Sequence, residues 1–314
     1  NIFAFRSHDD AVRAVKALCA KDVALNGEQA WTELYHGALS FLDNDEAGTA
    51  RHLSRCLELG DSPLANTFGS FTYKDDAFVA SLNSERPGNT DFRLDDQSSA
   101  LVHRPREGDA VVHAMSCDGF YFSQFGPKIA ASLDAKGGSR TLFHIHVMNA
   151  ENSTESLLTE IRAAHPDLRL NVTSSRVEFD PQTTKMNRKA FFTCGRFLIA
   201  PDLMRIYGLP VLVTEFDAEL ARDPALHADA LANVDVGLSF YTSQDYFPWN
   251  RVWAGTVFGN TTEAGRRFLQ LTADFCAAFL SAPKVRDHLW HVDQNALHCV
   301  HRFMTMKPKV AATA

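Results

Sequence analysis

Length, composition and charge place this chain among ordinary globular proteins. It has 314 residues, of which 45% are hydrophobic and 22% charged, and its formal net charge of −7 offers no basic surface for a nucleic acid or an anionic membrane. No apolar stretch approaches the ~20 residues that span a bilayer, no basic-then-apolar signal opens the chain, and none of the six cysteines forms a CxxC pair. We therefore expect a reduced, cytoplasmic protein.

Residues 1–84 are predicted to form an all-helical subdomain. Apolar residues recur there at intervals of three and four, as in the stripe of Val12, Val15 and Leu18, and never in sustained alternation. Residues 31–60 resemble one degenerate tetratricopeptide-type helical hairpin. Because stacked hairpins need neighbours to bury their faces, a single one is expected to end a longer array or to cap the next domain, and to hold an acceptor or a protein partner.

The rest of the chain is predicted to be a linker, at residues 85–108, and an α/β domain, at residues 109–314. The linker has little periodicity, whereas strand and helix patterns alternate after it. Strands are expected at 109–117, 141–149, 168–174 and 210–214, and helices up to Gly137, at 153–164 and at 186–199, the last ending before Pro201. Such crossovers imply a mostly parallel, Rossmann-like sheet with helices on both faces and ligands at the carboxyl ends of its strands.

Three carboxylates follow two of the predicted strands. Asp118 follows the first strand, and Glu215 and Asp217 follow the fourth. Two carboxylates spaced i, i+2 at a strand end direct hard oxygen donors to one side, which suits Mg²⁺ or Mn²⁺ bridging a diphosphate. The alternative is an acidic loop that caps the following helix. No GxGxxG or Walker sequence is present, so neither a dinucleotide fingerprint nor a P-loop would bind the phosphates.

Five short segments resemble, in the same order, motifs of one enzyme family. They are residues 117–122 (CDGFYF), 189–198 (KAFFTCGRFL), 211–218 (VLVTEFDA), 253–258 (WAGTVF) and 293–297 (DQNAL). Together they resemble GT-A glycosyltransferases of the glycogenin and bacterial galactosyltransferase type, over about residues 109–304. The resemblance implies a GT-A-like fold and the transfer of a hexose-type sugar from a nucleoside-diphosphate-sugar donor, assisted by Mn²⁺ or Mg²⁺.

The resemblance also implies roles for the residues near the donor nucleotide. Asp118 would meet the nucleobase or ribose. Arg196 would neutralise the donor phosphates, for which its planar, bidentate fork is suited. Glu215 and Asp217 would replace the family's metal-binding Asp-x-Asp, although Glu215 has a longer arm than aspartate and must shift to keep the metal geometry.

Four more matching residues would lie near the donor sugar. Ala254 and Gly255 would let the backbone approach the sugar, and Asp293 and Gln294 would face the reacting anomeric carbon. The family's late His-x-x-Gly-x-x-Lys-Pro segment, whose histidine completes the metal site, is missing, because residues 306–309 (MKPK) lack its His and Gly.

Other patterns leave a binding and a packing interpretation open. His298 and His301, one helical turn apart, are either replacement nitrogen ligands or ordinary surface or core histidines. His144 and His146 share one face of a predicted strand, which suits either zinc or packing beneath a helix with hydrogen-bond partners. The aromatic run at residues 240–253 is either an acceptor platform, because aromatic faces stack on sugar rings, or plain core.

The sequence therefore predicts a metal-assisted glycosyltransferase acting on an unknown glycan or protein acceptor, without a nucleic-acid partner or a membrane span. The alternative is a non-catalytic glycosyltransferase-like scaffold that binds nucleotides or proteins, which the altered Glu-x-Asp and the missing histidine would explain. An unrelated Rossmann-like small-molecule enzyme is disfavoured because the chain has no glycine-rich turn.

Overall fold

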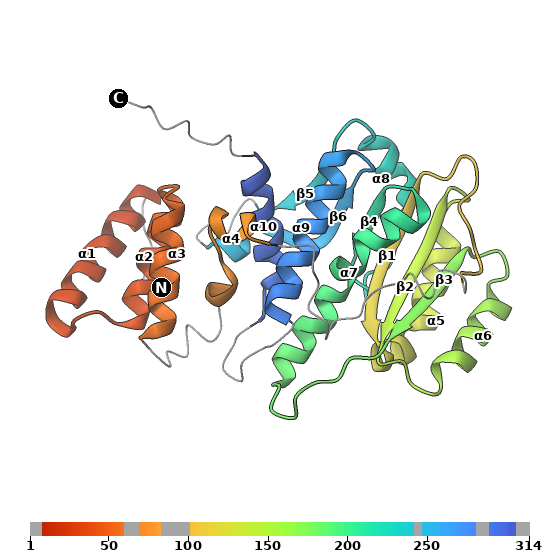
Figure 1. Cartoon of the computed structure of the whole chain (residues 1–314), viewed down its shortest axis with the longest axis horizontal. Helices are drawn as coiled ribbons and strands as arrows, with labels where there is room; N and C mark the ends of the chain where they lie inside the picture. Colours follow the sequence, from red (N-terminus) through yellow and green to blue (C-terminus); the bar gives the residue numbers. More distant parts are fainter. Residues whose placement is uncertain (1–7, 60–68, 83–100, 242–246, 281–288, 306–314) are drawn as a thin grey trace.

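The N-terminal part of the chain is built from helices. The computed structural model describes residues 8–59, 69–82, 101–241, 247–280 and 289–305 (Figure 1). Its first elements are α1 (His8–Asn26), α2 (Ala30–Leu42), α3 (Glu46–Glu58), the short 3-10 helix η1 (Gly69–Thr72) and α4 (Asp76–Ala80). Asp45 and Asp75 cap the amino ends of α3 and α4, where each carboxylate accepts a backbone N–H bond. The predicted helices are confirmed for these residues, while the tetratricopeptide interpretation and the domain division stay predictions.

A six-stranded sheet forms the centre of the rest of the molecule. Its strands are β1 (Val111–Asp118), β2 (Thr141–Met148), β3 (Leu170–Ser175), β4 (Val211–Thr214), β5 (Val236–Phe240) and β6 (Val252–Gly259). They lie in the order β3-β2-β1-β4-β6-β5. The first four strands are parallel, and β6 runs antiparallel to both β4 and β5. The expected mostly parallel sheet is therefore confirmed.

Helices cover both faces of this sheet (Figure 1). On one face lie α5 (Gly119–Lys136) and α6 (Thr154–Ala164), and on the other lie α7 (Lys185–Tyr207), α9 (Glu263–Leu280) and α10 (Val292–Thr305), with α8 (Pro224–Ala230) and the 3-10 helix η3 (Pro248–Asn250) in the connections. Side chains of β1 alternate between the two faces, so Val112 and Ala114 pack with α7 while Met115 packs with α5. The apolar cluster on the α7 face continues to Leu34 and Leu53 of the N-terminal helices. No helix in the described ranges has the length and apolar character to cross a membrane.

Helix α7 corrects one prediction. The helical run was expected to end before Pro201, but the helix continues through the proline to Tyr207, and Gly208 ends it with a φ of 65°. Proline has no N–H and removes one intrahelical bond. The following turns nevertheless remain helical because Leu203, Met204 and Tyr207 are buried against the sheet. Tertiary packing thus outweighs the local preference.

His144 and His146 lie beneath α7 in a chain of hydrogen bonds. His144 bonds Tyr207 Oη and Thr173 Oγ1, and His146 bonds Thr173 Oγ1 and Ser175 Oγ, all at 2.9 Å. Burial lowers the pKa of His144 to about 3 and that of His146 to about 4, so both rings are neutral at neutral pH. Among the described residues no group of three His, Cys, Asp or Glu side chains is arranged to hold a metal. The packing interpretation of these histidines is therefore confirmed.

The end of the predicted linker lies against the amino edge of the sheet. Residues 101–110 contain no helix or strand, and residues 83–100 lie outside the described ranges. Asn171 bonds the backbone N–H and carbonyl of His103, at 2.9 and 2.8 Å. Asp109 forms a two-pronged ion pair with Arg169, with bonds of 2.6 and 2.8 Å. These contacts fix where β1 begins.

Candidate active site at the carboxyl edge of the sheet

A pocket opens where the carboxyl ends of β1 and β4 meet. These strands are neighbours, but the chain leaves β1 toward β2 on one side and returns to β4 on the other. Such a switch in strand order leaves a crevice in which open α/β sheets bind ligands. The pocket has a volume of about 290 Å³, near the lower end of small-molecule sites. It is lined by the end of β1, the segment after β4, one face of α7, Ala254 of β6 and residues 289–294.

Asp118 ends β1 and begins α5. Its carboxylate accepts a 2.7 Å bond from the backbone N–H of Tyr121, which makes it the N-cap of α5. Asp118 also lines the pocket and remains half-exposed. The capping and the binding interpretations therefore describe the same side chain, because a carboxylate has a second oxygen and further lone pairs to offer a ligand.

Glu215 and Asp217 lie directly after β4, and both line the pocket. The Glu215 side chain is 41% exposed and has one oxygen 3.7 Å from Arg196 Nη2. Asp217 is exposed at the rim. Because the four residues of β4 are all buried, the polar residues that follow stand at the sheet edge, as the sequence predicted.

Arg196 is the buried cation of the pocket, only 3% exposed. The preceding residue, Gly195, packs closely against β1 and β2. A Cβ at Gly195 would lie 2.4 Å from Met148 Cε and 2.9 Å from Ser116 Oγ, so a larger residue here would require these two side chains to shift. Nη2 of Arg196 donates to the carbonyl oxygen of Ala254 and to Asp293, each at 3.2 Å.

Asp293 and Gln294 belong to the first turn of α10, which enters the pocket. Asp293 is 6% exposed and pairs with Arg196. Its other oxygen accepts a 2.9 Å bond from the backbone N–H of Gln294. A carboxylate at a helix amino terminus also meets the positive end of the helix dipole. Asp293 is therefore held in place from two sides, and Gln294 remains partly accessible.

Gly255 is the one predicted site residue that the structure does not place at the pocket wall. It is buried on β6, and Ala254 alone of the pair lines the pocket. A Cβ at Gly255 would lie 2.3 Å from the indole ring of Trp253, on the same face of the strand. The glycine makes room for this tryptophan, so its small size has a packing cause.

The structure also adds wall residues that the sequence interpretation had not assigned. On α7 these are Ala190, Cys194 and a group formed by Lys189, Phe192 and Thr193, which precede Arg196 by seven, four and three residues. That spacing places this group and Arg196 on one helical face, so the periodicity of the quoted motif could have revealed them. Four carboxylates and two cationic side chains line the pocket, with Lys189 as the second cation, so an excess of negative charge remains.

Residues 289–291, just before α10, complete the wall. Trp290 is 40% exposed and Tyr121, at the start of α5, 39%, so two aromatic rings with free surface border the pocket. His291 has a φ of 69°, in the left-handed region that few side chains adopt. Burial lowers the pKa of His291, and the charge of Asp293 opposes this effect. No sequence pattern marks a positive φ at a histidine.

His298 and His301 do not line the pocket. His298 is buried against Phe41 and Tyr73, with ring centroids 5.6 and 6.2 Å away, and His301 contacts Phe240 at 5.4 Å. Burial lowers the pKa of His298 to about 3. Neither is placed to replace the missing family histidine.

The aromatic run at residues 240–253 does not reach the wall either, in its described part. Trp249 is buried and stacks on Phe247, with ring centroids 4.8 Å apart, whereas Phe240, Tyr241 and Trp253 are exposed elsewhere. Residues 242–246 lie outside the described ranges. The core interpretation fits Trp249, and an acceptor platform formed by the other rings stays a prediction.

Comparison with solved structures finds a distant likeness, whereas the other comparisons find none. No family model matches the chain, and no curated protein matches it. Among solved structures, it is similar to the apo form of mouse xyloside xylosyltransferase 1, with a TM-score of 0.37 and 12% identity, over 62% of this chain and 82% of that one. At so low a TM-score, function has to be inferred from the pocket itself.

Proposed function

We propose that this protein transfers a hexose-type sugar from a nucleoside-diphosphate-sugar donor and that the pocket between β1 and β4 is its active site. The proposal rests on the way in which residues from different parts of the chain meet in one pocket. Residues far apart in the sequence, from Asp118 through Arg196 and Glu215 to Asp293, line one pocket at the switch point of the sheet. The same residues carry the motif resemblance.

The cations would receive the donor's phosphates. Only Nη2 of Arg196 has acceptors among the described residues, and its buried Nε has none. A desolvated guanidinium with unused donors is suited to a planar, bidentate contact with phosphate oxygens. Lys189, exposed two turns earlier on the same helical face, would add a mobile positive charge.

A divalent cation would bind together with the donor. Since the described residues contain no preformed group of three metal ligands, Glu215 and Asp217 would hold the ion jointly with phosphate oxygens and water, as is usual for Mg²⁺. Their hard oxygens suit Mg²⁺ or Mn²⁺. When bound, the cation would stabilise the negative charge of the departing diphosphate.

The sugar end of the donor would face α10. Asp293, held by Arg196 and by the amide of Gln294, supplies a fixed carboxylate near the sugar, and Gln294 offers an amide for its hydroxyls. Tyr121 and Trp290 provide aromatic faces at the mouth, on which a nucleobase or a sugar ring can stack.

Donor screening tests this function. The full chain is incubated with Mn²⁺ and a panel of nucleotide sugars, and release of nucleoside diphosphate is measured with and without glycan acceptors. We expect release from one donor class, and its loss in Asp293→Asn. Nucleotide binding without any release would instead support the non-catalytic scaffold, and no binding at all would refute both.

A further inference from the structure

One helix connects the candidate active site to the N-terminal helical region. The first turn of α10 lines the pocket, while the remainder of the helix lies between α4 and α9 (Figure 1). Arg302 follows Asp293 by nine residues, or about 14 Å along the helix axis. The two ends of α10 therefore meet two different parts of the molecule.

One face of α10 contacts the N-terminal region from Asn295 to Arg302. Asn295 donates from Nδ2 to the carbonyl oxygen of Gly69, at 2.6 Å, and to Thr72 Oγ1, at 2.8 Å. One turn later, the buried ring of His298 packs on Phe41 and Tyr73. These residues and Arg302 are spaced i, i+3, i+7, which places them on one helical face.

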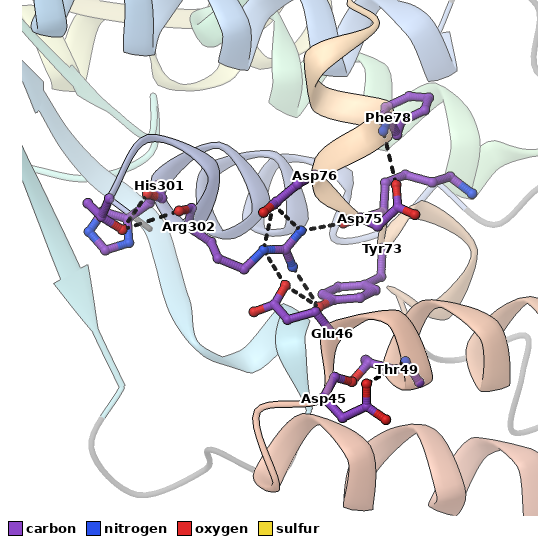
Figure 2. A network of polar contacts seen from close by, with 12 residues as sticks. Asp45, Glu46, Thr49, Tyr73, Asp75, Asp76, Phe78, His301 and Arg302 are labelled. Atoms are coloured by element: carbon purple, nitrogen blue, oxygen red, sulfur yellow. Dashed lines mark hydrogen bonds and ion pairs between the residues drawn. The ribbon is translucent and has the colours of Figure 1, made fainter. Parts of the chain in front are cut away.

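Arg302 makes several polar contacts with the N-terminal region (Figure 2). Its side chain is 3% exposed and forms ion pairs with Glu46 of α3 and with Asp76 of α4, the latter at 2.9 Å. It also donates to Tyr73 Oη at 2.6 Å and to the carbonyl oxygen of Lys74 at 3.0 Å. Acceptors from two helices and the segment between them thus fix one guanidinium, whose planar shape allows little sliding.

We propose that the N-terminal helical region sets the position of α10 and that Arg302 is a positioning residue for Asp293. A helix transmits displacement along its axis as a nearly rigid element, so a shift where Arg302 is anchored moves the first turn in the pocket. The carboxylate of Asp293 has a direct reporter, because the amide of Gln294 donates to it and the next amide, of Asn295, bonds the carbonyl of His291 at 3.0 Å. A partner that binds the helical region would then change the position of Asp293 in the pocket.

Amide hydrogen exchange of the full chain tests this coupling without any ligand. Arg302→Lys keeps the charge but loses the planar fork. Arg169→Lys is the matched control, since it alters another buried arginine pair at the opposite edge of the sheet. We expect the amides of Gln294 and Asn295 to exchange at least about tenfold faster in Arg302→Lys and within about twofold of the parent in Arg169→Lys. Equal rates in the two variants would overturn the proposal.

A milder variant decides the matter if Arg302→Lys does not fold. Glu46→Gln changes a side chain that is 26% exposed and leaves Asp76 and Tyr73 on the guanidinium. The expected result is a smaller acceleration, several-fold, at the same two amides. An unchanged exchange rate there would contradict the coupling.

A second test rests on the proposed function and uses uridine diphosphate with Mn²⁺, or the nucleoside diphosphate that binds the parent. If Arg302 acts through Asp293, Arg302→Lys weakens binding in the parent background but has no further effect in Asp293→Asn. Additive losses would mean a general structural role. If the parent binds no nucleotide, the proposed function fails, while the exchange experiment still decides the coupling.

Discussion

Two buried arginine–aspartate pairs lie at opposite edges of the same sheet, and they differ in how completely the arginine is used. At the amino edge, both terminal nitrogens of Arg169 donate, to the two oxygens of Asp109 and to the carbonyls of Arg104 and Ser139, at 2.6–3.2 Å. At the carboxyl edge, Arg196 uses one terminal nitrogen, and its two bonds are 3.2 Å long. Among the described residues, Nε of both arginines is buried without a partner. Both terminal nitrogens of Arg169 are used by the protein, whereas only one terminal nitrogen of Arg196 has acceptors in the described part of the chain.

The difference suggests different roles for the two arginines: Arg169 stabilises the fold, and Arg196 is available to a ligand under the proposed function. A buried ion pair contributes to stability only when its hydrogen bonds are satisfied, since desolvation otherwise outweighs the attraction. Arg169 meets this condition at both terminal nitrogens, and its bonds hold the pKa of Asp109 below its usual range although burial opposes them. Arg196 does not meet it within the protein, and a phosphate would supply what is missing.

Acidification should lower the free energy of unfolding more than any single substitution, because it protonates histidines in the buried interior. Burial lowers the pKa of His113 to about 4, as it lowers those of His144 and His146. Histidines with a lowered folded pKa contribute stability above their unfolded pKa of about 6.5, and this stability is lost as the pH falls toward the folded values. With His298, whose pKa burial lowers to about 3, four such groups imply a loss of about 5 kcal/mol per pH unit below pH 6.5. Urea unfolding from pH 7.5 to 5 measures it, and a flat profile would contradict neutral burial.

Breaking the pair of Arg169 and Asp109 should lower stability but leave nucleotide binding unchanged. We expect Arg169→Met to lower the free energy of unfolding by about 3–5 kcal/mol, because it leaves the buried Asp109 carboxylate without its cationic partner. Urea denaturation gives this value. Double replacement with Asp109→Asn is the control and should recover part of the loss. A folded Arg169→Met chain that no longer binds nucleoside diphosphate would remove the distinction between the two edges.

Breaking the pair of Arg196 and Asp293 should mainly weaken nucleotide binding. Arg196→Ala is expected to weaken nucleoside-diphosphate binding by about 2 kcal/mol, or about thirtyfold in Kd, with partial rescue in Arg196→Lys. Calorimetric titration gives the Kd, and circular dichroism checks that each variant is folded. Unchanged affinity in a folded Arg196→Ala chain would exclude this arginine from the donor site.

The smallest effect concerns His291, whose positive φ favours glycine. We expect His291→Gly to be neutral or to raise the free energy of unfolding by up to about 1 kcal/mol, because glycine adopts this backbone without strain. Asn149, which has a φ of 52° outside the pocket, provides the binding control Asn149→Gly, which also removes the 2.7 Å bond that Asn149 Oδ1 accepts from the Val177 N–H. If the imidazole contacts the ligand, only His291→Gly weakens nucleotide binding. Equal binding in both variants would leave His291 with no role at the site.

Much of the fold and of the site is encoded in local patterns. The buried run Val211–Thr214 required a central strand, and this placed Glu215 and Asp217 at the sheet edge, as predicted. The alternation of strands and helices predicted that the candidate site lies at the carboxyl edge. Helical spacing from Lys189 to Arg196 also held the information for one wall of the pocket.

What the sequence did not reveal depends on contacts between distant segments. Strand β5 and the antiparallel direction of β6 were not predicted, although the motif resemblance implied a strand at residues 253–258. The passage of α7 through Pro201, which burial of Leu203 and Met204 maintains, was not predicted either. The pairing of Arg196 with Asp293 joins helices 97 residues apart. Gly255 was assigned to the donor sugar from a motif, whereas the indole of Trp253 explains its size.

The central claim is that the pocket at the switch point binds a nucleoside diphosphate through its carboxylates and a divalent cation. Titration of a panel of nucleoside diphosphates into the parent chain, with Mn²⁺ and with chelator, compared with Asp217→Asn and Glu215→Gln, tests it most directly. Asp217 is exposed, so its substitution should leave stability within about 0.5 kcal/mol. We predict Mn²⁺-dependent binding of one nucleotide by the parent, abolished in Asp217→Asn and weakened less in Glu215→Gln. Binding that is the same in Asp217→Asn and the parent would contradict this account.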